Sequence, residues 1–365
     1  MKPRHHSPFL SKSHGFGSAV RSLLWALTCI ITAGFTIARE VSPQDKLLWS
    51  CYMICWSLNR DFHGFYDRPL DRPPADGSSS RLVDLQRAME AGVDALSVDL
   101  FISDKNALPA FGDLVKLIHE HNLPIQLSPM FDGLADPGLS LDEVAGKIES
   151  WFQRFAKEPC VVRTAGKPVL FTFGAASLPP AHWEALWQRL HTAGCDGFWV
   201  GELSHYLATG ESPDLQRAAP WLALFPAANS FNVHSAERAA ALISTYHTRY
   251  PAGHAWVAPV SMGYWRPEIA VHTSQRGTGL FRDTWNAIAN SEVNWVQQST
   301  WNDLGENHHL MPSENRGTVF LALNRYLAAQ WKGLPQLDDA RFFLSQRSEV
   351  MVGEGVLQWL KKQNL

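Results

Sequence analysis

The chain lacks the short motifs that indicate a bound nucleotide or a structural metal. It has no G-x-G-x-x-G after a strand-like run and no Walker motif, so no organic cofactor is expected. It has no H-E-x-x-H pattern and no second cysteine pair with zinc-site spacing. Lysine and arginine form no runs, and the formal net charge of -3 gives no broad attraction to nucleic acid. Dinucleotide chemistry and nucleic-acid partners are therefore not expected.

Cysteine is scarce as well, with 5 in 365 residues. Cys29 lies near the N-terminus, which leaves Cys51, Cys55, Cys160 and Cys195. In an oxidising compartment these four allow two disulfides and three connectivities. If Cys51 and Cys55 lie on one strand, they are about 13 Å apart, which is too far for a disulfide without distortion. We expect mostly buried free thiols and no metal site.

Residues 1–38 differ from the rest of the chain, because basic residues precede an apolar run from Leu23 to Ala38. The run has about 16 residues, whereas a membrane-spanning helix needs about 20. Thr36-Ile37-Ala38 also resembles a small-residue cleavage site. We favour a signal peptide and export to the periplasm or the medium. The long basic segment before the run keeps an uncleaved membrane anchor over residues 23–38 open as the alternative.

With 45% hydrophobic and 18% charged residues, the remainder is globular and long enough for one large core. Strand-like and helix-like stretches alternate along it. The strand-like runs are Leu47–Trp56, Ala95–Phe101, Pro124–Ser128, Pro168–Phe173, Gly197–Val200, Trp221–Phe225, Ala255–Val260 and Val293–Ser299. Helix-like stretches are Ser80–Ala91, Gly112–His121, Ser140–Phe155, Pro180–His191, Leu203–Arg217, Ala236–Tyr250, Gly279–Ala289 and Arg316–Gln330.

Eight strand and helix pairs predict an α/β fold, a single (β/α)8 TIM barrel over residues 45–335. Residues 336–365 are predicted to form a helical tail packed on the barrel. Catalytic residues of such barrels emerge at the carboxyl ends of the strands. That rule selects Trp56, Asp99, Asp132, Glu202, Tyr264, Trp265, Asp303 and Glu306. Asp94 stands at the start of its strand and is predicted to serve stability.

The segment Thr300 to His309 is the most informative, because it gathers two carboxylates, two imidazoles, an amide and an indole directly after a strand-like run. A pair of carboxyl groups can divide acid and base roles if their surroundings separate their pKa values. The simpler interpretation is a loop in which Asp303 makes a turn and Glu306 caps a helix. That interpretation does not account for the neighbouring Trp301, His308 and His309.

Trp301-Asn302-Asp303-x-Gly305-Glu306-x-His308 resembles the W-N-D-x-G-E-S-H signature of glycoside hydrolase family 71, the α-1,3-glucanases, which are grouped with the endo-acting family 99 enzymes. Weaker likenesses follow the family's order, at Leu47–Trp56, Ala91–Leu96, Ser128–Asp132 and Ala258–Ser261. The chain departs from the family in having Asp99 where an Asn is usual and Asn307 where a Ser is usual. Residues 224–230 also lack the Trp and Asp of the family's segment after the sixth strand.

The resemblance implies a glycoside hydrolase that acts on an α-glucan or related polysaccharide, with inversion, and the N-terminal segment predicts its export. It implies Glu306 as general acid and Asp303 as the group that activates water, although the spacing does not assign the two roles. The residues expected to contact the sugar are Trp56, Asp99, Asp132, Glu202, Tyr264, Trp265, Trp301, Asn302, His308 and His309. Trp56, Trp265 and Trp301 are the expected stacking platforms.

Two other classes of function remain open on the sequence. The missing Trp and Asp after the sixth strand favour a non-catalytic glycan-binding or polysaccharide-assembly protein on the same barrel. A metal-dependent hydrolase using His308, His309 and Glu306 is less favoured, because adjacent histidines rarely point at one ion. The sequence does not give the oligomeric state.

Overall fold

The computed structural model describes residues 40–56, 65–71, 79–208, 213–231, 233, 235–249, 254–266 and 271–335. The predicted signal or anchor (1–38) and the predicted helical tail (336–365) lie outside the described residues. Within the described ranges, no helix combines the length and the apolar character needed to cross a membrane.

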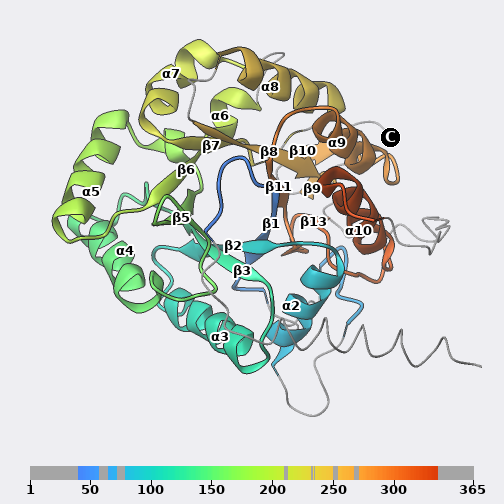
Figure 1. Cartoon of the computed structure of the whole chain (residues 1–365), viewed down its shortest axis with the longest axis horizontal. Helices are drawn as coiled ribbons and strands as arrows, with labels where there is room; N and C mark the ends of the chain where they lie inside the picture. The colour runs from blue at the N-terminus through green and yellow to red at the C-terminus, as the bar shows by residue number, and fades with distance from the viewer. Residues whose placement is uncertain are drawn as a thin grey trace, which may run out of the picture. The chain divides into compact units, whose positions relative to one another are not determined.

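Eight parallel strands close into a barrel, as Figure 1 shows. The strand order is β3-β2-β1-β11-β8-β7-β6-β5, and a pairing of β3 with β5 closes the ring. The strands are β1 (Leu47–Met53), β2 (Ala95–Phe101), β3 (Gln126–Asp132), β5 (Lys167–Thr172), β6 (Phe198–Glu202), β7 (Ala227–Asn229), β8 (Ala255–Ser261) and β11 (Trp295–Ser299). A short β4 (Arg163–Thr164) pairs antiparallel with β5. The predicted (β/α)8 barrel is confirmed.

Helices surround this ring (Figure 1) and cover the outer face of the strands. They are α2 (Ser80–Glu90), α3 (Ala107–Glu120), α4 (Leu141–Phe155), α5 (Pro180–Thr192), α6 (Ser204–Leu207), α7 (Leu215–Leu224), α8 (Ala236–Arg249), α9 (Gly279–Ala289) and α10 (Val319–Lys332). The predicted capping box at the start of α4 is present. The Ser140 hydroxyl accepts from the Glu143 N–H at 3.3 Å, and the Glu143 carboxylate accepts from the Ser140 N–H at 2.8 Å.

The predicted sixth strand, Trp221–Phe225, is wrong. Most of that run is the last part of α7, and the strand is the shorter β7 that follows it. The predicted helix Leu203–Arg217 is likewise divided between α6 and α7. A short apolar run has no period that distinguishes a strand from a helix, and Ala-Ala-Asn carries no strand propensity. The Asp214 side chain, which accepts from the Arg217 N–H at 3.0 Å, starts the helix instead.

Side chains that alternate along the strands form two cores. One fills the barrel, where Trp49 contacts Phe171 and Trp295 edge to face at 5.4 and 5.2 Å. The other lies between strands and helices and includes Tyr52. Because the interior is packed, a ligand can reach only the strand ends.

The cysteine prediction holds for three of the four described residues, because Cys51, Cys160 and Cys195 are free and buried. Cys55 is exposed instead, since β1 ends at Met53 and Cys55 follows in a turn. Asp94 serves stability as predicted. Its Oδ2 accepts from the Leu48 N–H at 2.9 Å and pairs with Lys332 Nζ at 2.7 Å.

A buried carboxyl group ties α2 to the barrel. Asp84 accepts a hydrogen bond from the Tyr52 hydroxyl at 2.9 Å and one from Trp301 Nε1 at 3.3 Å. Burial raises the pKa of Asp84 from 3.8 to about 7, against the opposing effect of these two hydrogen bonds. The folded chain therefore keeps a proton at Asp84 that the unfolded chain releases at lower pH.

This proton makes stability depend on pH, and the Asp84→Asn variant should lose that dependence. The contribution is fully present below the unfolded pKa and is lost as pH rises through the folded pKa of about 7. The shift of the Asp84 pKa from 3.8 to about 7 corresponds to a contribution on the order of 4 kcal/mol to the free energy of unfolding. An Asn at this position can still accept from Trp301 and can pair with the Tyr52 hydroxyl.

The measurement is the free energy of unfolding in urea at several pH values between about 4 and 8. The wild type should lose more stability than Asp84→Asn over this range. Equal losses in the two proteins would contradict the assignment of the proton to Asp84.

Candidate active site

Five carboxylates gather at the carboxyl ends of the strands. Asp99 stands near the end of β2, Asp132 ends β3, Glu202 ends β6, and Asp303 and Glu306 follow β11. Their charges act on one another. Burial, and then the charges of Asp132 and Asp303, raise the pKa of Asp99 well above its ordinary value. The fold thus assembles the five carboxylates that the strand-end rule selected.

Asp303 is the most enclosed member of the pair after β11, with 6% of its surface exposed. Burial and the neighbouring charge of Glu306 raise its pKa from 3.8 to about 7. Its backbone N–H donates to the Thr300 hydroxyl at 2.8 Å, and its Oδ1 accepts from the Glu306 N–H at 3.0 Å. The side chain is therefore held in one orientation and can gain or lose a proton near neutral pH.

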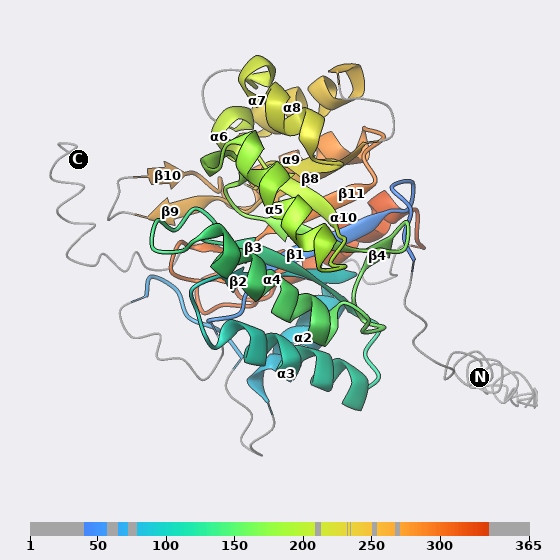
Figure 2. The same ribbon diagram turned by 90° about the vertical axis from the view of Figure 1, so that its left-hand side faces the viewer.

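Glu306 lies closer to solvent, with 30% of its side chain exposed. Arg266 Nη1 pairs with its Oε1 at 2.7 Å. Tyr264 also adjoins the carboxylate, and burial followed by the charge of Glu306 raises the pKa of the Tyr264 phenol to about 12. Both partners come from the hairpin of β9 (Tyr264–Arg266) and β10 (Val271–Thr273), which extends from one end of the barrel (Figure 2).

Backbone N–H groups hold two of the other carboxylates. Glu202 accepts from the N–H groups of Gly174 at 3.0 Å and Ser204 at 2.6 Å. Asp132 accepts from the N–H of Gly133, while burial and the charge of Glu202 raise its pKa. These two side chains are oriented toward the site by the turns that follow their strands.

The loop after β11 is fixed by close packing and by two short strands, β12 (Asn302–Asp303) and β13 (His308–His309). A Cβ atom at Gly305 would lie 2.6 Å from the Trp56 ring, so only glycine fits there. Arg316 donates to the carbonyls of Asn307 at 2.6 Å and His309 at 2.5 Å. The spacing of Asp303 and Glu306 is set by these contacts rather than by the ligand.

Three residues of the signature are buried and use their side chains within the protein. Trp301 is fully buried and donates to Asp84, because the chain turns inward directly after β11. Asn302 uses its side chain on the backbone of β1 and its turn, accepting from the Met53 N–H at 2.8 Å and donating to the Trp56 carbonyl at 2.8 Å. His309 is fully buried, with Nε2 3.2 Å from Asp67. All three position the loop.

His308 is buried as well, with 1% exposed, and its ring meets Tyr264 edge to face at 5.9 Å. Its predicted contact with the sugar stays a prediction, and in this structure its ring lies against Tyr264. Burial, and then the charge of Arg316, lower the pKa of His309 to about 4, so this imidazole is neutral at pH 7. Neither histidine is placed to hold a metal with Glu306. Among the described residues, no group of three His, Cys, Asp or Glu side chains could hold a metal ion.

Aromatic side chains border the carboxylates. Trp56 and Trp265, both predicted platforms, are partly exposed and contact Phe65 and Tyr66 at 4.9 and 4.8 Å between ring centroids. Sequence reasoning missed Phe101 and Phe173, which are 46% and 39% exposed at the ends of β2 and β5. It also missed Arg266. The signal for Phe101 was its position two residues after Asp99, on the same face of a strand.

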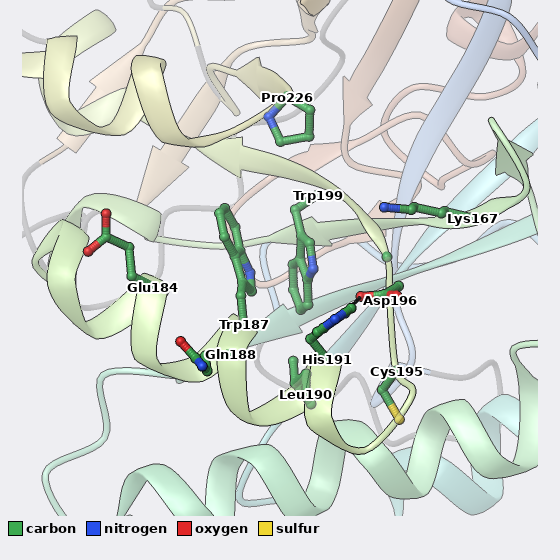
Figure 3. A pocket seen from close by; sticks show the side chains of 11 residues that line it. Lys167, Glu184, Trp187, Gln188, Leu190, His191, Cys195, Asp196, Trp199 and Pro226 are labelled. Atoms are coloured by element: carbon green, nitrogen blue, oxygen red, sulfur yellow. Dashed lines mark hydrogen bonds and ion pairs between the residues drawn. The ribbon is translucent and has the colours of Figure 1, made fainter.

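A cavity of about 530 Å³ lies elsewhere, between α5 and the amino ends of β5 and β6 (Figure 3). Trp187 and Trp199 face it, and His191 pairs with Asp196 at 2.8 Å beside it. At this end of a barrel, where the strands begin, side chains usually serve stability. The carboxylates beside the cavity are not those whose charges act on one another at the carboxyl ends of the strands. The chemistry therefore belongs to the opposite end.

Comparisons with known proteins bear on the family and the fold. The family model described as Glycosyl hydrolase family 71 matches residues 78–327. A search of curated proteins gives no match. Two structures of the GH99 endo-alpha-mannosidase from Bacteroides thetaiotaomicron, one in complex with BIS-TRIS-Propane, are similar to this chain at 15% identity and a TM-score of 0.62. They cover 79% and 80% of this chain and 98% and 99% of their own.

A GH2 beta-galacturonidase from Eisenbergiella tayi bound to galacturonate is similar at 10% identity and a TM-score of 0.53. The alignment covers 82% of this chain and 54% of that one. At such low identities these structures show the shared barrel and nothing further about the site.

Proposed function

Because the chain belongs to glycosyl hydrolase family 71 and is therefore a glycosidase, we propose that it hydrolyses an α-linked polysaccharide with Asp303 and Glu306 as its catalytic pair. The observation that carries the proposal is the contrast between the two carboxylates. Asp303 is enclosed and has a pKa of about 7, whereas Glu306 faces solvent beside Arg266. Two carboxyl groups in such different surroundings can divide acid and base roles.

In this proposal Asp303 is the base. A carboxylate with a raised pKa accepts a proton from water more readily than an exposed one, and it has little side-chain freedom to lose. Glu306 is the acid that protonates the leaving oxygen. Arg266 Nη1 occupies its Oε1 at 2.7 Å, so that contact must open when the leaving oxygen binds. The proposed outcome is inversion, which requires about 6.5 to 9.5 Å between the carboxyl groups and room for a water molecule.

The pH dependence of activity follows from the pair. Since Asp303 must be ionised while Glu306 is protonated, kcat/KM should pass through a maximum with pH, and one limb should fall near the Asp303 pKa of about 7. The measurement is kcat/KM between about pH 4 and 9, at substrate concentrations well below KM. A value that stays constant between about pH 6 and 8 would show that no group titrating near 7 takes part in catalysis.

The function itself is tested by product release from a panel of α- and β-linked polysaccharides, with α-1,3-glucan and α-mannan included. The wild type is compared with an Asp303→Asn and Glu306→Gln double variant of equal thermal stability. Products from the wild type alone would support the proposal, and NMR of the first anomer released would test inversion. Binding without products from any polysaccharide would favour a glycan-binding role.

We also propose that residues 1–38 direct export, on the basis of the basic segment and apolar run in the sequence. Expression of the full chain in a bacterial host, followed by fractionation and N-terminal sequencing, tests this. A mature N-terminus near Arg39 in the periplasm would support a cleaved signal. An intact N-terminus in the membrane fraction would support the anchor.

A further inference from the structure

Asp99 differs from the other carboxylates of the site in having an unsatisfied oxygen. Its side chain is 5% exposed, and Oδ1 is fully enclosed with no hydrogen-bond partner among the described residues. The side chain faces into the barrel end, because Ala95, Ser97 and Asp99 share one face of β2 and Ala95 belongs to the interior core. A buried polar atom without a partner is costly, and such atoms mark places where another group binds.

The charges around Asp99 identify the kind of group. Asp132 and Asp303 both act on Asp99 across the strand ends, and Glu202 acts on Asp132. Among the described residues, the ion pair of this site is that of Arg266 with Glu306, and none includes Asp99, Asp132 or Asp303. Like charges that are enclosed together repel strongly, and a cation placed between them relieves the repulsion.

We propose that the innermost sugar of the substrate carries a protonated amino group and that Asp99, with Asp132, binds it. An ammonium group is compact and has three donors, so it can satisfy Asp99 Oδ1 and a second carboxylate together. A neutral hydroxyl would satisfy the hydrogen bond but would bring no positive charge to favour the ionised forms of these carboxyl groups. A uronic acid or a sulfated sugar would add to it. This inference rests on the proposed function for the location of the sugar.

Binding of simple sugars tests the inference without knowledge of the linkage. Glucosamine, galactosamine and mannosamine are each compared with the parent hexose and with the N-acetylated sugar, using the full chain, by NMR titration at pH 7. At least one amino sugar should bind about tenfold more tightly than both its parent hexose and its N-acetylated form, a difference of about 1.4 kcal/mol in binding free energy. Asp99→Asn should reduce that preference to about threefold or less while binding of the parent hexose persists.

Asp113→Asn is the matched control, because Asp113 is 59% exposed on α3 and pairs only with Arg81 in the described part of the chain. It should keep the full preference. Asp132→Asn provides a second variant, and thermal unfolding shows whether each variant is folded. Equal binding of amino and parent sugars by the wild type, or no measurable binding of either, would overturn the inference. So would a preference that survives in both Asp99→Asn and Asp132→Asn.

These outcomes are separable from the fate of the proposed function. If polysaccharide hydrolysis depends on Asp303 and Glu306 but no amino sugar is preferred, the hydrolase stands and the amino-sugar site does not. If amino sugars are preferred but no polysaccharide is cleaved, the binding site stands without the catalytic pair.

Discussion

Glu306→Gln should lower the rate of polysaccharide hydrolysis by about 10²- to 10⁴-fold, the usual contribution of a positioned general acid. Glutamine keeps the shape of the side chain but has no proton to give to the leaving oxygen. The loss should depend on the leaving group. An aryl glycoside whose phenol departs without protonation should be hydrolysed by Glu306→Gln at a rate much closer to that of the wild type.

The measurement is kcat/KM on the polysaccharide and on aryl glycosides of increasing phenol acidity. Asp303→Asn supplies the comparison, because loss of the base should slow both kinds of substrate alike. Glu184→Gln, on the exposed side of α5, is the control for removal of a carboxylate and should retain full activity. If the aryl glycosides rescue Asp303→Asn and not Glu306→Gln, the two roles are reversed.

Trp301→Ala should be the most destabilising single change in the site region, costing about 3 to 5 kcal/mol of unfolding free energy. The indole is fully buried between β1 and α2, and its Nε1 donates to Asp84. Removing it leaves a cavity and takes one donor from a buried carboxyl group. Activity in the residual folded fraction should change less than stability, because the ring does not face the ligand.

Trp265→Ala is the contrasting variant. Its ring is partly exposed on the β9–β10 hairpin and contacts Tyr66, so the loss of unfolding free energy should be about 1 kcal/mol or less. Substrate affinity should fall instead, if the ring is a sugar platform. Urea unfolding followed by circular dichroism measures both variants. Equal stability of Trp301→Ala and wild type would contradict the structural role given to Trp301.

These two tryptophans show how far sequence reasoning about the site reaches. Both adjoin strand ends, and nothing in the local sequence separates a partly exposed ring from one that packs beneath the loop. The carboxylates could be placed together from the sequence, because strand ends are fixed by the alternation of strands and helices. The contacts of Asn302 and His309 with the loop could not, because a polar residue in a loop can serve a ligand or the loop itself.

Arg266 shows a second limit of sequence reasoning, which concerns residues far apart in the chain. It lies 40 residues from Glu306 in the chain, and the segment between β8 and α9 has no feature that predicts a hairpin folding back over the strand ends. The strand β7 was not predicted for a similar reason. Its three small residues have no strand propensity of their own and are extended because they pair with β6 and β8 on either side.

The sequence by itself determined the barrel, the strand ends that carry the carboxylates and the family, because hydrophobic period and short motifs are local properties of the chain. Only the tertiary structure decided which of two neighbouring carboxylates is enclosed and which one Arg266 pairs with. It also decided that the charges of Asp132 and Asp303 act on Asp99, whose Oδ1 has no hydrogen-bond partner among the described residues. Burial and charge at one point depend on groups from many strands. For that reason proton affinity and ligand preference follow from the closed barrel and not from any segment of it.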